Sequence, residues 1–395
     1  MEFNKSWNEY ILYDLANWKN GLAFKDINFS NKGKPIIKIA ELKNGITEQT
    51  KYTDGDYGEE VYLRKNDLIF SWSGNPKTSI DAFLYDLPEG YLNQHSFKIT
   101  EKKEVVEKYF LYYVLKYLNP MFQSIASDKQ TTGLGHVTIA DLKKIKVRIP
   151  DLEVQYKILN IVKNIDDKIY NNNQINDNLS EIIEKMFINF LEKHNEELVT
   201  LEDAVKKIGT GADAIQRAPI VEYDTGIRCI RVGDMTNSRK RYEWGFTEMT
   251  DKDFDNYKLD IGDIVVTRTA VNGLSYMIED DMKVVCNNGL IRMKVNEKYN
   301  PMFIYLYLKT KDFNEYVHRI DGETSVRPNM KVNYFTSYKI MKISKEEQDE
   351  ICNKLLPLRN KQKQIIEENN TLTQLRDTLL PKLMNGEIDL DKIEI

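Results

Sequence analysis

The sequence predicts an α+β protein in which two pseudo-symmetric globular domains are separated by two long antiparallel helices that form a coiled-coil spacer. Two observations lead to this prediction. The sequences of the segments Glu153 to Phe190 and Glu346 to Leu383 align without a gap at an offset of 193 residues. Each segment carries apolar residues at heptad spacing. Each segment also follows about 150 residues in which β-rich runs and a helix occur in the same order.

The duplication sets the expected domain boundaries. At 395 residues the chain exceeds the size of a single core, and 41% hydrophobic with 30% charged residues is an ordinary globular composition. We expect a first domain over residues 1–150, a first helix within 151–197, a second domain over 198–344 and a second helix within 345–395.

The first domain is expected to contain three strands, an amphipathic helix, a polar loop and a closing strand. Short runs rich in β-branched and aromatic residues indicate the strands, and apolar residues at helical spacing indicate the helix. In chain order these elements are Pro35 to Ala40, Asp67 to Trp72, Ser96 to Thr100, the helix Val105 to Leu118, the loop Ser127 to His136 and the strand Lys146 to Ile149.

The first long helix is predicted by a ten-position ladder of side chains. The polar ladder residues of the two long helices either fix the register and pairing of a two-stranded seam or lie where the ladder faces solvent; they are Asn172, Asn176, Asn369, Gln362 and Arg376. At 1.5 Å per residue, a helix of this length spans about 55 to 60 Å. The ladder consists of Ile158, Val162, Ile165, Ile169, Asn172, Asn176, Leu179, Ile183, Met186 and Phe190.

The second domain is expected to repeat the order of the first with little sequence identity. Three β-rich runs precede a helix, a polar loop and a final strand that ends just before the second long helix. These elements are Gly226 to Val232, Asp263 to Arg268, Gly289 to Val295, the helix Pro301 to Leu308, the loop Asp321 to Asn329 and the strand Tyr338 to Ile343.

The second long helix follows the same ladder with one interruption. Pro357 lies inside the ladder, and because proline lacks the backbone N–H and clashes with the preceding turn, we expect a kink or a break there. The ladder residues are Ile351, Leu355, Leu358, Gln362, Ile365, Asn369, Leu372, Arg376, Leu379 and Leu383.

Charge is distributed unevenly between these parts. The chain has a net charge of −5, but the first and second domains carry +2 and +1 while the two helical segments carry −5 and −3. Any surface for a polyanion on the domains must therefore come from local clusters of basic side chains. The acidic helices fit a protein-facing role better than a DNA-facing one, because carboxylates repel phosphates.

Several residues give the chain a resemblance to a known family. Each repeat begins E-x-Q, at Glu153 and Gln155 and again at Glu346 and Gln348. The run I-D-D-K-I at 165–169, the element N-N-x-L at 369–372 and the string L-R-D-T-L-L-P-K-L-M-N-G-E-I at 375–388 complete the pattern. Over its whole length the chain resembles the specificity subunit of a type I restriction-modification system.

The resemblance implies a non-catalytic DNA-recognition scaffold. Each domain is then a target-recognition domain that reads one half of a split, asymmetric site on double-stranded DNA, and the helices act as a ruler for the unread bases between the halves. It also implies two methyltransferase (modification) subunits, which carry S-adenosylmethionine and methylate adenine, and a restriction subunit that hydrolyses ATP and cuts DNA. The chain itself is expected to hold no cofactor.

The sequence contains no convincing catalytic or metal-binding motif. Asn119-Pro120-Met121-Phe122 and Asn300-Pro301-Met302-Phe303 resemble the N-P-P-F tetrad of amino-methyltransferases, but each lacks the second proline, and we interpret both as helix boundaries. No phosphate-binding loop for ATP is present. Three cysteines and four histidines, far apart, indicate neither disulfides nor structural zinc.

The chain is expected in the cytoplasm. No apolar run approaches the roughly 20 residues that cross a bilayer. The first ten residues, MEFNKSWNEY, lack the basic-then-apolar order of an export signal.

Candidate DNA-binding residues lie in loops at matching places in the two domains. Reading DNA requires basic side chains for phosphates and guanidinium, amide or hydroxyl groups for base edges. Solvated loops are the competing interpretation, and the dense basic run Arg239-Lys240-Arg241 is either a phosphate clamp or an exposed turn. The candidates in the first domain are Ser73, Asn75, Lys77, Lys129, Gln130, Thr131, Thr132 and His136. Those in the second are Arg239, Lys240, Arg241, Arg268, Thr269, Asn272, Thr324, Ser325, Arg327, Asn329 and Lys331.

Candidate subunit-docking residues lie on the helical repeats: Gln155, Glu181, Glu184, Gln348, Glu367 and Glu368. Two other functions remain open at this point. One is a self-contained adenine methyltransferase, which requires a cofactor-binding fold. The other is a pure interaction protein whose globular parts never contact DNA.

Overall fold

The computed structural model describes residues 7–130, 133–194, 197–237, 239, 241–323, 329–388 and 390. The chain divides into two compact units, one formed by Met1–Asn172 with Glu367–Ile395 and the other by Asn173–Ile366. Each unit combines one globular domain with half of each long helix.

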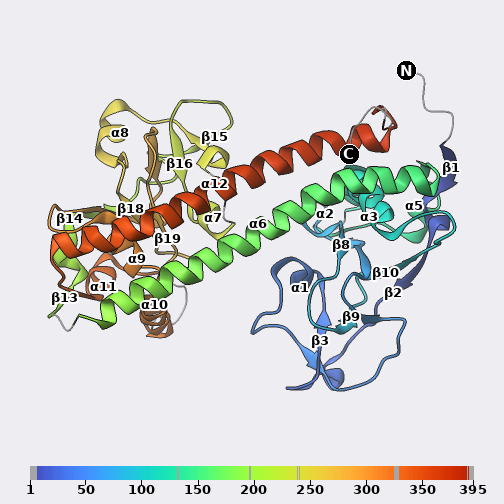
Figure 1. The fold of residues 1–395 in the computed structure, drawn as a ribbon, viewed down its shortest axis with the longest axis horizontal. Helices are drawn as coiled ribbons and strands as arrows, with labels where there is room; N and C mark the ends of the chain where they lie inside the picture. Colours follow the sequence, from blue (N-terminus) through green and yellow to red (C-terminus); the bar gives the residue numbers. More distant parts are fainter. Residues whose placement is uncertain are drawn as a thin grey trace. The chain divides into compact units, whose positions relative to one another are not determined.

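The two long helices are α6, Leu152–Glu192, and α12, Lys345–Met384 (Figure 1). Their bounds agree with the predicted repeats to within a few residues. Of the kink or break expected at Pro357, a break does not occur, because α12 continues through this residue. Pro357 and Asn353, whose carbonyl loses its helical partner, are both exposed. Leu355, fully buried, keeps this part of α12 packed on its unit.

In the first unit, polar ladder residues join α6 to α12. Asn172 and Asn369 are 1% and 8% exposed, and Asn172 Nδ2 donates to Asn369 Oδ1 at 2.8 Å. Nearly two turns away, Arg376 Nη1 donates to Asp166 Oδ1 at 2.8 Å. The later residue of α6, Asn172, pairs with the earlier residue of α12, Asn369, and the earlier residue Asp166 pairs with the later residue Arg376. The helices are therefore antiparallel here. Asn172 and Asn369 therefore lie inside the seam and do not face solvent, and their pairing is compatible with a role in fixing the register.

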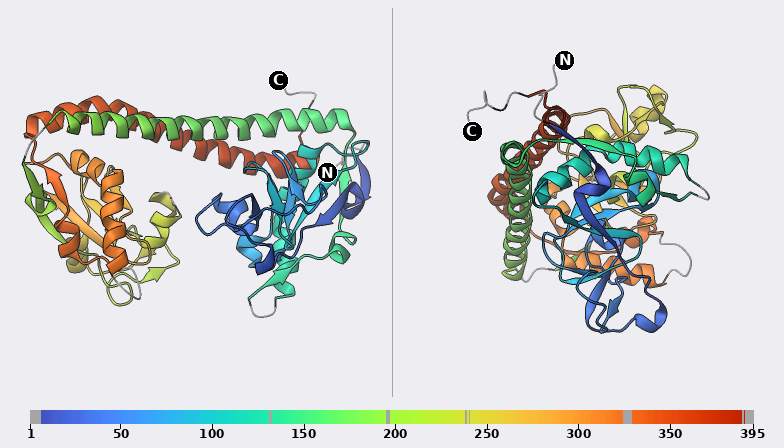
Figure 2. Two further views of the ribbon diagram at one scale, coloured as in Figure 1. Left: turned by 90° about the horizontal axis from the view of Figure 1, so that it is seen from below. Right: turned by 90° about the vertical axis from the view of Figure 1, so that its right-hand side faces the viewer.

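The second unit contains the other halves of the helices, also antiparallel (Figure 1 and Figure 2). Gln362 Nε2 donates to Ser180 Oγ at 2.8 Å, and His194 Nε2 lies 3.4 Å from Glu347 Oε1. On the domain side, Arg359 donates to Glu279 at 2.9 Å with both side chains less than a fifth exposed.

The first domain is built on an antiparallel sheet in the order β2-β10-β6-β8. A second small sheet, β4-β3-β9-β5, contains one parallel pair, β3 with β9. The strands are β1 Asn8–Ile11, β2 Ala16–Asn20, β3 Lys34–Ile37, β4 Tyr52–Thr53, β5 Tyr62–Leu63, β6 Leu68–Ser71, β7 Ser73–Gly74, β8 Asp81–Leu84, β9 Gly90–Leu92, β10 Ser96–Glu101, β11 Gly135–His136 and β12 Lys146–Ile149. The helices are η1 Leu12–Leu15, η2 Asp26–Asn28, α1 Ile39–Asn44, α2 Pro76–Ser79, α3 Lys108–Tyr117, α4 Asn119–Asp128 and α5 Ile139–Leu142.

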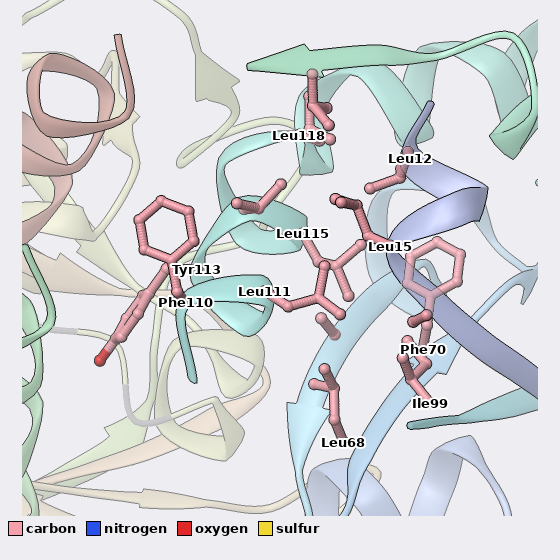
Figure 3. Packing of buried hydrophobic residues seen from close by; sticks show 14 of the residues in the cluster. Leu12, Leu15, Leu68, Phe70, Ile99, Phe110, Leu111, Tyr113, Leu115 and Leu118 are labelled. Atoms are coloured by element: carbon pink, nitrogen blue, oxygen red, sulfur yellow. The ribbon is translucent and has the colours of Figure 1, made fainter. Parts of the chain in front are cut away.

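The core of the first unit lies between the main sheet, α3 and η1. Figure 3 shows Leu111 and Leu115 of α3 among Leu12 and Leu15 of η1 and Leu68 of β6, all at most 1% exposed. Full burial of each such side chain stabilises the fold by about 1.5–3 kcal/mol. The same cluster includes side chains of both long helices, namely Ile158, Val162, Leu380 and Leu383. The helices are therefore part of the domain core.

The second domain repeats the topology of the main sheet. Its main sheet has the order β14-β21-β18-β19, and its small sheet, β15-β17-β16-β20, again contains one parallel pair, β16 with β20. The strands are β13 Leu198–Thr200, β14 Val205–Thr210, β15 Ile220–Val221, β16 Arg228–Ile230, β17 Phe246–Thr247, β18 Ile264–Thr267, β19 Ser275–Met277, β20 Val284–Cys286, β21 Leu290–Val295 and β22 Lys339–Met341. The helices are η3 Leu201–Ala204, α7 Val232–Thr236, η4 Arg241–Glu243, α8 Asp251–Tyr257, α9 Pro301–Tyr307, α10 Lys311–Glu323 and α11 Val332–Thr336.

Two predicted strands are too long, for the same reason in each domain. The strand predicted over Pro35 to Ala40 ends at Ile37, because α1 begins at Ile39 and the Glu41 carboxylate accepts the Lys38 N–H at 3.0 Å. The strand predicted over Gly226 to Val232 gives way to α7, where Asp234 accepts the Arg231 N–H at 2.9 Å. In both cases an acidic side chain caps the first turn of a helix.

The predicted polar loops are also shorter than expected. Asp128 is the last residue of α4, and Gly135 and His136 form β11. In the second domain α10 continues to Glu323. Each polar loop therefore follows directly after a helix of its own domain, α4 in the first and α10 in the second.

Candidate nucleic-acid interface

The two candidate loops of the first domain meet in a short antiparallel ladder. Gly74 pairs with Gly135 and Ser73 with His136, and Ser73 Oγ lies 3.3 Å from His136 Nδ1. Trp72 lies between β6 and β7, and its ring centroid lies 6.3 Å from that of His136. The structure thus brings the segment after β6 and the segment after α4 to one edge of the domain.

The second domain contains the same arrangement. Thr269 pairs with Asn329 in an antiparallel bridge. The N–H of Met330 donates to the carbonyl of Arg268 at 2.8 Å, as the N–H of Val137 donates to that of Trp72 at 2.8 Å. These backbone contacts make Arg268 the counterpart of Trp72 and Asn329 the counterpart of His136.

The chain leaves the main sheet through an unusual backbone conformation at this edge in both domains. Gly74 has a φ of +133°, and its counterpart Ala270 has a φ of +64°, in the left-handed region that favours glycine. Glycine is required on the facing strand of the first domain, because a Cβ on Gly135 would lie 2.1 Å from the carbonyl oxygen of Ala126. We call the two facing segments of each domain its loop pair. In the first domain Ser73 and Gly74 face Gly135 and His136, with Trp72 at the base, and in the second domain Thr269 faces Asn329, with Arg268 at the base.

Two polar candidates of the first domain already have internal partners. Asn75 Oδ1 accepts the N–H groups of Lys77 at 3.1 Å and Thr78 at 3.3 Å, so this side chain caps α2. Lys129 Nζ lies 2.5 Å from both carboxylate oxygens of the nearly buried Asp141. Lys77 and Gln130 are exposed.

The pairing of Lys129 with Asp141 affects the ionisation of the carboxyl group. Burial acts to raise the pKa of Asp141, but hydrogen bonds from Lys129 and Thr138 outweigh it and hold the pKa below its ordinary value. The positive charge of Lys129 is therefore partly compensated by Asp141 within the domain.

Arg268 is held in place by neutral acceptors. Its Nε donates to the carbonyl oxygen of Met330 at 3.2 Å, Nη1 donates to that of Asn288 at 3.2 Å, and Nη2 donates to Asn329 Oδ1 at 2.9 Å. The side chain is partly exposed. Around it, Thr269 and Asn272 are partly buried, and Asn329 and Lys331 are exposed.

The basic run of the second domain lies elsewhere, between α7 and η4. Arg239 is paired with the buried Asp234 at 3.2 Å, and Arg241 is paired with Asp280. Both described arginines thus have carboxylate partners within their own domain. Six further candidates, namely Thr131, Thr132, Lys240, Thr324, Ser325 and Arg327, lie outside the described residues.

Two of the six docking candidates are internal. Gln155 and Gln348 are fully buried. Gln155 accepts the Glu107 N–H at 2.8 Å and Gln348 accepts the Asn300 N–H at 2.8 Å, and each amide nitrogen donates to the carbonyl just before its helix. A side chain without exposed surface does not contact a partner directly. The structure corrects their expected role: they attach the long helices to α3 and α9.

The other docking candidates lie on the helix surfaces. Glu181, Glu184 and Glu367 are exposed, and Glu181 pairs with Lys185 at 3.2 Å along α6. Glu368 accepts from Asn172 Nδ2 at 2.8 Å and therefore also supports the helix pair. Exposed apolar side chains occur on the same helices, namely Tyr156, Tyr170, Ile175 and Ile182 on α6 and Leu356, Ile366 and Leu375 on α12.

Among the described residues, no group of three or more histidine, cysteine, aspartate or glutamate side chains is arranged to hold a metal ion. The three cysteines are free and buried. Burial raises the pKa of Cys229 to about 11 and that of Cys352 to about 12, and it also raises the pKa of Cys286. These thiols therefore stay protonated near neutral pH and are poor nucleophiles.

The two N-P-M-F segments are helix boundaries, as interpreted from the sequence. Asn119 begins α4, and Asn300 caps α9 by accepting the Met302 N–H at 2.9 Å. In the part of the chain that the structure describes, no helix is both long and apolar enough to cross a membrane.

Trp72 is a candidate that sequence reasoning missed. It was placed at the end of a predicted strand, but the structure puts it beside His136 and in the place that Arg268 occupies in the second domain. The sequence does contain a signal for Trp72. Alignment of residues 67–77 with residues 263–273 places Trp72 at the position of Arg268, which is a candidate DNA-binding residue.

Comparison with known proteins identifies a family. The model of the type I restriction modification DNA specificity domain matches the chain twice, over residues 4–181 and 197–374. The chain is 22% identical to the type I restriction enzyme EcoBI specificity subunit of Escherichia coli, over 98% of this chain and 87% of that one. It is 23% identical to the HindI specificity subunit of Haemophilus influenzae, over 97% and 99%.

The fold has a solved counterpart. The crystal structure of the type I restriction-modification system S subunit from M. genitalium matches with a TM-score of 0.55 at 17% identity, over 97% of this chain and 96% of that one. The two family matches together span most of the chain, each covering one domain and most of the helix that follows it. The chain therefore belongs to the type I restriction-modification DNA specificity family, with two copies of the family's domain.

Proposed function

We propose that this specificity subunit reads a split, asymmetric site on double-stranded DNA, with the loop pair of each domain contacting one half-site. The observation that carries the proposal is the repeated backbone frame with different side chains. The same bridge and the same backbone hydrogen bond place Trp72 and His136 in one domain and Arg268 and Asn329 in the other. One scaffold that displays two chemistries suits the reading of two different sequences.

The proposed DNA contacts divide by chemistry. Exposed Lys77 and Lys331 are suited to phosphates, which position the protein without reading sequence. Gln130, His136, Asn329 and Arg268 carry the amide, imidazole and guanidinium groups that read base edges. Arg239, Arg241 and Lys129 rank lower because each has a carboxylate partner within its own domain.

The paired helices are proposed to have two further roles. They set the separation of the half-sites, and they receive two modification subunits and, through the complex, the restriction subunits. Support for docking comes from the exposed acidic side chains Glu184 and Glu367 and from the exposed apolar side chains on α6 and α12. All methyl transfer, ATP hydrolysis and cleavage then belong to the partners.

Base-resolution methylation sequencing of a host with and without the gene, in the presence of the modification subunit, tests this function. We expect methylated adenines in one split motif, with two unlike half-sites at a fixed separation, that disappears when the gene is removed. An unchanged methylome together with no DNA retardation by the assembled complex would show instead that the chain only assembles partners.

The isolated chain is also expected not to bind S-adenosylmethionine. Titration calorimetry with the purified chain measures this directly. Stoichiometric binding would favour a self-contained methyltransferase over a recognition subunit.

A further inference from the structure

We infer that Arg268 reads a guanine in the half-site bound by the second domain. The inference rests on the proposed function and adds to it one residue and the base that this residue selects. Its basis is the geometry of the guanidinium group, its charge environment and its place on the loop pair.

The guanidinium group is oriented before any ligand binds. Three hydrogen bonds, to the carbonyls of Met330 and Asn288 and to Asn329 Oδ1, hold it at 2.9 to 3.2 Å from its partners. Two of the acceptors, at Asn329 and Met330, lie on the facing segment of the loop pair, and the third, at Asn288, lies in the turn after β20. A side chain held this way loses little conformational entropy on binding.

The hydrogen bonds leave the reading groups available. A guanidinium has five N–H donors, and the described contacts use three, one on each nitrogen. Among the described residues, one donor on Nη1 and one on Nη2 therefore have no partner. Guanine presents two acceptors in the major groove, O6 and N7, which arginine contacts with a pair of donors.

The charge of Arg268 is not neutralised by a carboxylate among the described residues, since its partners are two carbonyls and one amide oxygen. This differs from Arg239, Arg241, Arg359 and Arg376, each of which is paired with an aspartate or glutamate. An oriented, uncompensated guanidinium at the edge of a DNA-reading domain is suited to an electron-rich partner.

The first domain has a different side chain at the position that corresponds to Arg268. In the first domain the same place holds Trp72, with His136 in the place of Asn329. An indole supplies one N–H donor and an apolar surface, and Trp72 Nε1 already donates to Asn20 Oδ1 at 2.9 Å. We therefore expect the guanine contact in only one of the two half-sites.

The chief alternative is that Arg268 binds a phosphate. The Arg268→Lys substitution distinguishes a guanine contact from a phosphate contact, because lysine keeps the positive charge but lacks the planar guanidinium group. Arg292→Lys is the matched control: Arg292 is also held by carbonyl oxygens, of Thr210 and Asn256, but it lies on β21, outside the loop pair.

The experiment is methylation sequencing of a randomised DNA library by the assembled methyltransferase complex. For Arg268→Lys we expect the first half-site to be unchanged and one G·C position of the second half-site to lose about tenfold to a hundredfold in discrimination. Arg292→Lys should retain the wild-type motif. An unchanged motif with uniformly weaker methylation would assign Arg268 to a phosphate and overturn the inference.

A second measurement uses the wild-type protein and so does not depend on how a variant folds. Each guanine of the second half-site is replaced in turn by 7-deazaguanine, which pairs normally but lacks the N7 acceptor. Replacement at one position should weaken binding of the complex by about tenfold. Insensitivity at every position, or a second half-site without any G·C pair, would refute the guanine contact, whereas the absence of any split motif would refute the proposed function itself.

Discussion

At the scale of single residues, two buried glutamines fix the attachment of the long helices. Gln155 connects the start of α6 to the backbone before α3, with bonds to Glu107, Val105 and Pro150 of 2.8 to 2.9 Å. Gln348 does the same for α12 and the residue before α9. The glutamine of each E-x-Q start thus has a structural cause, since its buried amide pairs with backbone groups of its own domain.

Replacement of Gln155 by alanine should destabilise the protein by about 2–4 kcal/mol, because it leaves a buried N–H and two carbonyls without partners and opens a cavity. Urea denaturation followed by circular dichroism measures the change. Gln130→Ala, at an exposed position, is the control and should change the free energy of unfolding by less than about 0.5 kcal/mol. Equal effects of the two substitutions would contradict the attachment role.

The pair formed by Lys129 and Asp141 should appear in the pH dependence of stability. The pKa of Asp141 is lower in the folded protein than its ordinary value, so the folded state favours the charged carboxylate. The resulting stability is present above the ordinary pKa of aspartate and is lost as the pH falls through the lower, folded-state pKa. Asp141→Asn should therefore be less stable than wild type at pH 7, and thermal melts should converge below about pH 4. A difference that persists unchanged at pH 3 would argue against this pair.

The residue scale also shows the limit of sequence reasoning about the site. The loop pair could be predicted in part because the duplication places Ser73 and Thr269 after equivalent strands. The internal use of Asn75 as a helix cap and of Lys129 as a partner of Asp141 could not, because both depend on hydrogen bonds formed by the fold. Trp72 was missed because an aromatic residue ending an apolar strand looks like core.

At the scale of elements, the long helices were the most predictable part of the fold and the short strands the least. The heptad pattern recurs over more than five turns, so α6 and α12 were located to within a few residues. β2, Ala16–Asn20, is polar and short, and its identity comes from pairing with β10 some eighty residues later. Such long-range pairing leaves no local signal.

Pro357 allows a test at this scale. Because α12 continues through an exposed proline, Pro357→Ala restores a helical hydrogen bond without disturbing a packed side chain. The substitution should raise the free energy of unfolding by about 1–3 kcal/mol, which a thermal melt detects as a higher Tm. As a control, Asn360→Ala at another exposed position of α12 should have a small effect. A lower Tm for Pro357→Ala would mean that the proline shapes α12 for its partners.

At the scale of the whole molecule, the chain consists of two units with one plan. Each unit buries side chains of both long helices in the core of its own domain, so neither helix is an appendage. Each unit has its own polar contacts between α6 and α12, through Asn172 and Asn369 in one and Gln362 and Ser180 in the other. This plan underlies the proposal that the helix pair sets the separation of two readers.

The most direct test of this proposal lengthens the helix pair. A seven-residue insertion after Asn173 in α6, matched by one after Ile366 in α12, preserves the heptad seam and adds about 10 Å to each helix. Methylation sequencing with the assembled complex should return both half-sites unchanged, separated by up to about three additional base pairs at 3.4 Å each. Half-sites that keep their original separation, in a variant that still folds and methylates, would contradict the proposal that the helices measure the gap.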